Sequence, residues 1–202
     1  MRRLASLFLF LLFLFPVMSA AGEADIIPPE YQMLASAGTA ASAARYSRSE
    51  ADIFMESLTD VMREELVRSV LSENDELILA RMLWGEDREN PMYMRAAIIW
   101  CVFNRMDQSH LPIEQLINKT QFPGYREENP VKDWAIELIR DVAVRYVLEQ
   151  NGFTDVGRVL PKEYLYYEQP PGKRYHIFKT KLKLSDKSNK IWDWSLPSPY
   201  DE

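Results

Sequence analysis

The chain has 202 residues, a formal net charge of −6 at pH 7 and an aromatic content of 12%. That many aromatic side chains argue against a disordered chain, and the length suits a single well-filled domain. The acidic balance argues against nucleic acid as a partner, and one cysteine cannot form an internal disulfide.

Sequence motifs exclude several enzyme classes. The two histidines are not in H-E-x-x-H or another paired-histidine spacing, so no metal site is predicted. The G-x-S-x-G motif of serine hydrolases is absent, and the 7 glycines form no glycine-rich loop for a nucleotide. We therefore expect no metal and no cofactor.

Residues 1–21 have the pattern of a signal peptide. Arg2-Arg3 lead an apolar stretch, Leu4 to Val17, and small residues follow at positions 19–21. The apolar stretch, about 14 residues, is shorter than the roughly 20 that a membrane-spanning helix needs. We expect an exported monomer, in the cell envelope or extracellular, with no membrane span after cleavage. A retained N-terminal anchor is the alternative.

The next segment, residues 22–46, is rich in alanine and contains Pro28-Pro29. This composition predicts a low-complexity linker, which places a single domain at residues 47–202. Helical spacing of apolar residues over 50–72 predicts one amphipathic helix that starts at a capping pattern, Ser47 to Glu50. Its acidic polar face favours packing against the core over a membrane surface.

Two apolar helices joined by a charged turn are predicted next. The first is capped by Asn74 and ends near Trp84, where Gly85 can adopt the left-handed conformation that terminates helices. The second starts near Pro91 and continues to Met106. It is apolar almost all round, which predicts a buried central helix.

Glu86 lies in this charged turn, against the most hydrophobic part of the chain. Burial beside apolar groups raises the pKa of a carboxyl group. A carboxylic acid that keeps its proton near neutral pH can protonate a leaving oxygen, as the cleavage of a glycosidic bond requires. The alternative is a solvated turn, in which Glu86, Asp87 and Glu89 face water and Arg88 pairs with one of them.

The remaining elements are one long helix and a hairpin. The helix opens at Asn129-Pro130 and ends at Gly152. Strands predicted at 164–167 and 174–184 make the fold class mainly α with a small β-hairpin. The second strand is basic in an otherwise acidic chain. Its lysines either attract anionic polymers or protect the edge of the hairpin from pairing.

The pattern AR-x-L-x-GE-x-R, followed by AA and NR, resembles the spore cortex-lytic (SleB-type) cell wall hydrolase family. The resemblance covers about half of the chain, residues 74–180, and departs from the family at residues 89–92, where a glycine-rich stretch is common. The residues that carry it are Ala80-Arg81, Leu83, Gly85-Glu86, Arg88, Ala96-Ala97, Asn104-Arg105, Gln121-Phe122, the tyrosine-rich strand at 164–167, and Tyr175-His176-Ile177-Phe178.

This resemblance implies a lysozyme-like helical domain that cleaves peptidoglycan glycan strands between N-acetylmuramic acid and N-acetylglucosamine. Glu86 would be the single catalytic glutamate of a lytic transglycosylase, in which the sugar's own 6-hydroxyl attacks and an anhydro product forms. A hydrolase would need a second carboxylate.

The predicted substrate-binding residues are Gln121, Phe122, Tyr166 and His176. For the first two, a core phenylalanine beside an exposed glutamine is the alternative. The alternative function for the whole chain is a non-catalytic envelope protein that binds glycan or a protein partner.

Overall fold

The structure is a computed structural model that describes residues 48–118, 121–169, 174–183 and 186–200. The predicted signal peptide, residues 1–21, and the predicted linker, residues 22–46, lie outside the described residues. None of the helices in the described part of the chain is both long enough and apolar enough to cross a membrane.

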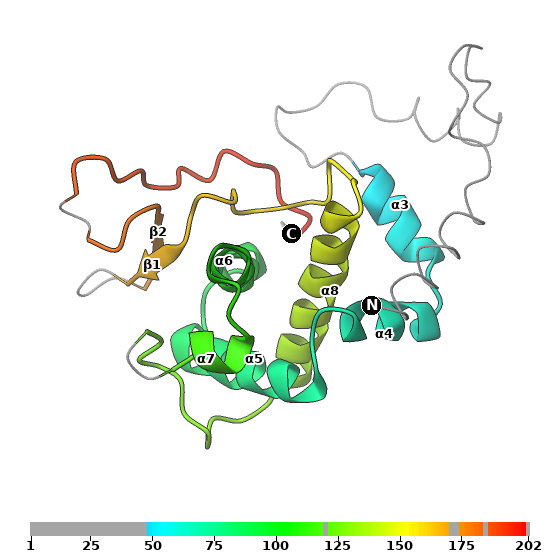
Figure 1. Ribbon diagram of the computed structural model, residues 1–202, viewed down its shortest axis with the longest axis horizontal. Coiled ribbons are helices and arrows are strands. Elements are labelled where there is room, and N and C mark those ends of the chain that lie inside the picture. Colours follow the sequence, from blue (N-terminus) through cyan, green and yellow to red (C-terminus); the bar gives the residue numbers. More distant parts are fainter. Residues whose placement is uncertain (1–47, 119–120, 170–173, 184–185, 201–202) are drawn as a thin grey trace, which may run out of the picture. The chain divides into compact units, whose positions relative to one another are not determined.

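Helix α6, Met92–Ser109, lies at the centre of the fold. It contacts helix α5 (Glu73–Glu86), helix α7 (Ile113–Leu116), helix α8 (Asp133–Gln150) and strand β1. Figure 1 shows it end-on among these elements. Every residue from 96 to 104 is buried, because the run is apolar on all sides of the helix. The predicted buried central helix is therefore confirmed.

The N-terminal helical region differs from the prediction of one helix over 50–72, which is wrong. It forms helix α3, Glu50–Ser57, and helix α4, Asp60–Arg68. The break occurs because Leu58 is extended and the hydroxyl of Thr59 accepts the backbone N–H of Met62, which starts a new helix. The first cap is Ser49, paired with Asp52 in a capping box, and not Ser47.

The ends of α5 also differ from the prediction. Its N-cap is Ser72, which shares a capping box with Asp75, so Asn74 lies inside the helix. The helix continues through Gly85 and ends at Glu86, two residues beyond the predicted end. Gly85 therefore does not terminate the helix, and its role is in packing.

Helix α8 runs beside the central helix and also contacts α3, α4 and α5. It begins at Asp133, three residues after the predicted Pro130, and Gly152 follows its end with a φ of 97°. That left-handed backbone is the predicted glycine terminator.

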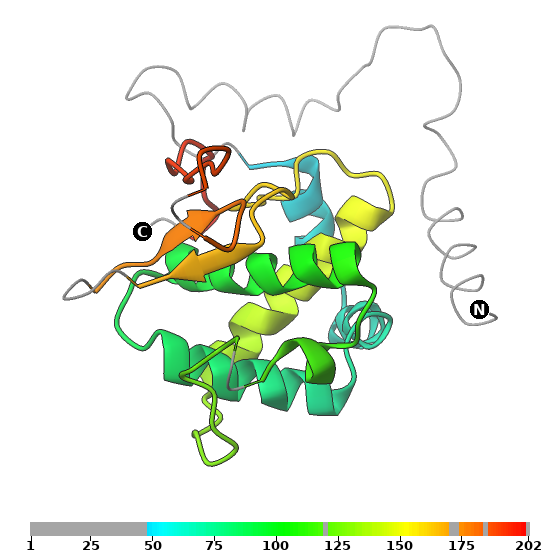
Figure 2. The same cartoon turned by 60° about the vertical axis from the view of Figure 1, so that its left-hand side comes forward.

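Strands β1, Tyr166–Glu168, and β2, Ile177–Lys179, form a two-stranded antiparallel sheet in which Tyr167 pairs with Phe178. Figure 2 shows this hairpin along one side of α6, with α5 on the opposite side. The described chain is thus mainly helical with a small β-hairpin, as predicted. Lys179 does not protect an edge: it is buried, pairs with Glu168, and a backbone bridge to Ile191 covers that side of β2.

Candidate active site

Glu86 is the last residue of α5, and its side chain meets the loop that follows α7. The backbone N–H of Gly124 donates to Glu86 Oε1 at 2.6 Å. The hydroxyl of Tyr167, from β1, lies near enough to lower the pKa of the carboxyl group, and it donates to the sulfur of Met82 at 3.9 Å. Glu86 is partly exposed, so a carboxyl group that is largely enclosed by protein still has access to a ligand.

Two glycines make this arrangement possible. A β carbon on Gly85 would lie 1.8 Å from the carbonyl oxygen of Gly124, and one on Gly124 would lie 2.4 Å from the carbonyl oxygen of Gly85. The backbones therefore touch where no side chain could fit. Asn129 fastens the loop there, since its Nδ2 donates to the carbonyl oxygens of Arg81 at 3.0 Å and Gly124 at 2.9 Å.

The environment of Glu86 favours its protonated form. Burial is the main cause, and it raises the pKa of the Glu86 carboxyl group above its ordinary value. The Gly124 N–H, the Tyr167 hydroxyl and the charge of Arg126 oppose that rise in pKa, whereas the charge of Asp87 adds to it. A carboxylic acid with a raised pKa has the property that general acid catalysis requires.

Tyr167 stands between Glu86 and the aromatic core. Its ring lies 6.0 Å from that of Phe122, 5.7 Å from Phe178 and 5.2 Å from His176, measured between centroids. Burial and the neighbouring Glu86 charge raise the pKa of Tyr167 well above its ordinary value. The phenol therefore keeps its proton and stays a potential hydrogen-bond donor beside Glu86.

Asp87 and His176 form a second polar group beside Glu86, and both side chains are buried. His176 Nε2 lies 3.7 Å from Asp87 Oδ2. Burial lowers the pKa of His176, and this outweighs the opposing effects of the Asp87 carboxylate and the Glu86 backbone carbonyl. His176 is therefore neutral near pH 7.

The four residues predicted to bind substrate have different surroundings. His176 is 3% exposed and Phe122 is 1% exposed, so neither ring forms an open surface. Gln121 is exposed, and its side-chain oxygen accepts from Arg105. Tyr166 is partly exposed, with the Arg105 guanidinium 5.8 Å from its ring centre. Arg105 thus contacts both Gln121 and Tyr166.

Sequence reasoning missed Gly124 and selected Tyr166 of the two adjacent tyrosines. Successive strand residues point to opposite faces, so only one of Tyr166 and Tyr167 can face α5. The period-two pattern was visible in the sequence, but it does not say which face meets the helix. For Asp87, the sequence indicated only that it follows Glu86, and neither its burial nor its proximity to His176 could be predicted.

Neither a family model nor a curated protein nor a solved structure matches this chain. Function is therefore argued from the site and its surroundings. Among the described residues, no group of three or more histidine, cysteine, aspartate or glutamate side chains is arranged to hold a metal ion.

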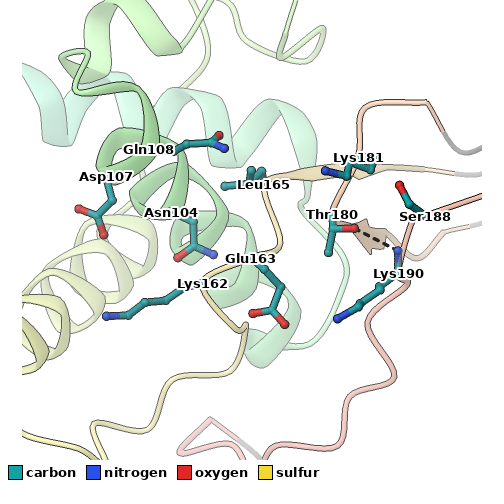
Figure 3. Close-up of a pocket in the computed structure, with 10 residues that line it drawn as sticks. All are labelled: Asn104, Asp107, Gln108, Lys162, Glu163, Leu165, Thr180, Lys181, Ser188 and Lys190. Atoms are coloured by element: carbon teal, nitrogen blue, oxygen red, sulfur yellow. Dashed lines mark hydrogen bonds between the residues drawn. The ribbon is translucent and has the colours of Figure 1, made fainter. Parts of the chain in front are cut away.

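A hollow of about 650 Å³ lies between the C-terminal part of α6 and the segment after β2. Figure 3 shows Asn104, Asp107 and Gln108 of α6 on one side of it, and Thr180, Lys181, Ser188 and Lys190 on the other. Leu165, which immediately precedes β1, also lines the hollow. The lining residues are Asn104, Asp107, Gln108, Lys162, Glu163, Leu165, Thr180, Lys181, Ser188 and Lys190.

The charged groups around this hollow are only partly neutralised. Lys162 pairs with Glu149 at 3.3 Å, and Asp107 accepts from the hydroxyl of Tyr146. Within the described residues, the ammonium groups of Lys181 and Lys190 have no carboxylate within ion-pair distance. Lys181 and Lys190 thus offer two cations to an anionic ligand, in a hollow that the carboxylates of Asp107 and Glu163 also line.

Proposed function

We propose that this protein is an exported enzyme that cleaves peptidoglycan glycan strands, with Glu86 as the general acid. The observation that carries the proposal is the environment of Glu86. Its carboxyl group has a raised pKa, bonds to the Gly124 N–H, and lies against a tyrosine hydroxyl at a partly exposed position. These are the requirements for donating a proton to a glycosidic oxygen and then stabilising the resulting carboxylate.

The reaction divides into two steps at this residue. Glu86 first gives its proton to the glycosidic oxygen between N-acetylmuramic acid and N-acetylglucosamine as the C–O bond breaks. The Gly124 N–H and the Tyr167 hydroxyl then stabilise the carboxylate that is left. That carboxylate next accepts the proton of the sugar's own 6-hydroxyl as this oxygen attacks the anomeric carbon. An anhydro sugar forms, and Glu86 is protonated again.

The surroundings of the neighbouring carboxylates favour this lytic transglycosylase route over a hydrolase. A hydrolase needs a second carboxylate across the bond, free to act as nucleophile or base. The Asp87 side chain is 1% exposed and faces His176. The Glu89 side chain is 74% exposed and lies 3.5 Å from Arg174 on the surface. Neither is placed like a second catalytic group beside Glu86.

Two further features support a carbohydrate polymer as substrate. The sequence pattern around Glu86 resembles that of the spore cortex-lytic family, whose members have a lysozyme-like fold, and we extend that fold to this chain as part of the proposal. The exposed polar and aromatic groups of Gln121 and Tyr166 can contact sugar hydroxyls and rings. The hollow with Lys181 and Lys190 can take the carboxylates that peptidoglycan carries on its peptide stems.

The test is direct. Purified protein is incubated with purified peptidoglycan, the loss of turbidity is followed, and the soluble products are analysed by mass. Anhydro ends support the transglycosylase route, whereas products heavier by one water identify a hydrolase. No cleavage of any peptidoglycan would refute the enzymatic proposal.

A second candidate function is a non-catalytic envelope protein that binds glycan. The lysine-lined hollow favours it, because a hollow with unneutralised cations can bind an anionic polymer without any chemistry at Glu86. Co-sedimentation with insoluble peptidoglycan separates the two functions. A binder that releases no soluble fragment, and whose retention is unchanged by Glu86→Gln, is the result expected of this second function.

A further inference from the structure

Asp87 and His176 are an unusual pair because both are buried and neither completes its hydrogen bonds. Within the described residues, Asp87 Oδ2 and both ring nitrogens of His176 lack a hydrogen-bond partner. Leaving such groups unpaired in a protein interior is costly. The two groups face each other across 3.7 Å, which makes Asp87 Oδ2 a candidate partner for His176 Nε2.

The other oxygen of Asp87, Oδ1, already accepts two hydrogen bonds, so Oδ2 is the oxygen that can accept from His176. Asp87 Oδ1 accepts from the backbone N–H and from Nδ2 of Asn90, both at 3.0 Å. Asn90 Nδ2 also donates to the carbonyl oxygen of Arg174 at 2.6 Å. The turn after Glu86 is thus already fastened to the segment that leads into β2, close to His176.

A bridging water does not fit between the pair. A water that hydrogen-bonds both atoms lies about 2.8 Å from each, so it holds them about 4 Å or more apart unless its two bonds meet at less than a right angle. The two atoms here lie 3.7 Å apart. A closure of less than 1 Å makes a direct Nε2–H···Oδ2 hydrogen bond. The geometry therefore favours direct contact between the two side chains.

We propose that Asp87 and His176 form a buried positioning pair, with the Nε2–H of a neutral imidazole bonded to Asp87 Oδ2, that holds the β-hairpin on the end of α5. In this way the pair places the Tyr167 hydroxyl on Glu86. The inference deepens the proposed function, since it assumes that Glu86 is the acid. The pair itself is testable without activity.

The Asp87–His176 pair is connected to Glu86 through Tyr167. His176 immediately precedes β2, whose Phe178 pairs with Tyr167. The His176 ring also meets the Tyr167 ring edge-on, at an interplanar angle of 87°. A shift of His176 therefore moves Tyr167, whose hydroxyl lowers the pKa of Glu86.

The groups that face His176 determine its charge. They are the Asp87 carboxylate, the Glu86 backbone carbonyl, the Tyr167 ring and the sulfur of Met94, which accepts the His176 backbone N–H at 3.5 Å. Of these, the carboxylate and the carbonyl favour the imidazolium, yet burial outweighs them. The ring is therefore neutral, and the proposed pair requires its proton on Nε2.

The first experiment is ¹⁵N NMR of the histidine rings in the full chain. The chain has only two histidines, and the exposed His110 supplies a reference signal in the same spectrum. We expect His176 to be neutral at pH 7, protonated on Nε2, and to titrate at lower pH than an ordinary histidine. A charged ring at pH 7, or a proton on Nδ1, would overturn the proposal.

The Asp87→Asn variant extends this test. Loss of the carboxylate charge removes a cause that raises the pKa of His176, so the titration midpoint of His176 should fall. The midpoint of His110 should not move. An unchanged midpoint for His176 would show that the two side chains do not interact. If the variant does not fold, the spectrum of the wild-type chain decides alone.

The second experiment measures glycan cleavage. Asp87→Asn and His176→Gln should each lower kcat about 10- to 100-fold with little change in KM, because they misplace Tyr167 without touching substrate. The double variant should lose little more than either single variant. Glu89→Gln, on the neighbouring exposed residue, is the matched control and should keep full activity. Multiplied losses in the double variant would contradict the pair.

These two experiments separate the inference from the proposed function. If the wild-type protein cleaves no peptidoglycan, the proposed function fails, while the histidine spectra still decide for or against the Asp87–His176 pair. If cleavage is present but the spectra show a charged or Nδ1-protonated His176, the proposed function stands and the positioning pair is refuted.

Discussion

The backbones of Gly85 and Gly124 are in contact. Gly124 comes 38 positions after Glu86, the residue that follows Gly85. This contact places the Gly124 N–H on the Glu86 carboxyl group, because the loop can approach the end of α5 only where neither chain carries a side chain. The position of the candidate acid thus depends on two residues that take no part in the chemistry.

Replacing Gly124 by alanine should disturb both the fold and the reaction. The new β carbon would lie 2.4 Å from the Gly85 carbonyl oxygen and 2.8 Å from Glu86 Oε1, so the loop must move away. We expect a lower thermal midpoint and a loss of cleavage of about 100-fold, since misplacement by about 1 Å can cost that much. Denaturation and turbidity assays measure the two effects.

Gly152→Ala provides the control for that variant. Gly152 has a φ of 97°, and no atom lies within 4 Å of an added β carbon. Alanine there is strained by the backbone alone, at about 1–2 kcal/mol, and lies outside the site. Stability should fall while cleavage by the folded protein is unchanged. Full activity in Gly124→Ala would contradict the role of the glycine contact.

Glu86→Gln should abolish glycan cleavage and leave the fold intact. Glutamine keeps the shape of glutamate but has no proton to give near neutral pH, and general acid catalysis contributes about 100- to 10,000-fold. Glu89→Gln, which changes an exposed carboxylate, should lose far less. Equal losses in the two variants would instead indicate a two-carboxylate hydrolase.

The same substitution predicts a change in stability with a definite sign. Because the folded pKa of Glu86 is raised, the folded state binds its proton more tightly than the unfolded state. The free energy of unfolding therefore falls as pH rises from the ordinary glutamate pKa through the raised one. Above that window, Glu86→Gln should be as stable as wild type or slightly more stable, as measured by thermal denaturation.

The pH dependence of cleavage should follow Glu86. A raised pKa extends the protonated, active form to higher pH, so the alkaline limb of kcat/KM should lie above the ordinary glutamate value. The positive charge of Arg126 lowers the pKa of Glu86, and Arg126→Gln should therefore move this limb to still higher pH. Arg48→Gln, which removes a cation paired with Glu56 on α3, should not move it.

Asn104→Ala should reduce stability more than chemistry. Its Nδ2 donates to the carbonyl oxygens of Pro161 at 2.9 Å and Tyr164 at 3.0 Å, and its Oδ1 accepts from Arg158 at 2.7 Å. Loss of the amide leaves buried polar groups unpaired, at a cost of about 1–3 kcal/mol. Chemical denaturation measures that cost, and the exposed Gln108→Ala on the same helix is the control.

A variant at Asn104 that keeps wild-type stability but loses cleavage would assign this residue to the site. Such a result would also show that the segment after α8, which Asn104 fastens to the central helix, is held by other contacts.

The lysine-lined hollow should contribute to polymer binding. Reversing both charges, as in the double variant Lys181→Glu with Lys190→Glu, should weaken co-sedimentation with insoluble peptidoglycan about 5- to 10-fold, with less effect at high salt. Lys187→Glu is a matched control, because this exposed lysine does not line the hollow. Equal effects of the single control and the double variant would indicate unspecific attraction by the basic segment.

Several features could be determined from the sequence alone because they depend on local pattern. The continuous apolar run after Pro91 predicted the buried central helix, and the glycine after the long helix predicted its end. Each of these follows from side-chain periodicity or backbone preference.

Helix boundaries were less predictable, because competing caps lie close together. Ser47 and Ser49 can both cap the first helix, as can Ser72 and Asn74 for α5, and in each pair the residue with an aspartate three positions later is the cap. Apolar spacing continued through the break before Thr59, so periodicity alone gave one helix where the backbone forms two.

The tertiary structure alone decided the candidate site. Burial raises the pKa of Glu86, while the N–H of Gly124, 38 residues away, and the hydroxyl of Tyr167 on the hairpin oppose that rise, and local sequence carries no record of either group. The hairpin's position on α5 selects Tyr167 over Tyr166 and buries His176 against Asp87. Sequence indicates which residue types can do the chemistry; only packing between distant segments determines their hydrogen bonds, burial and charge.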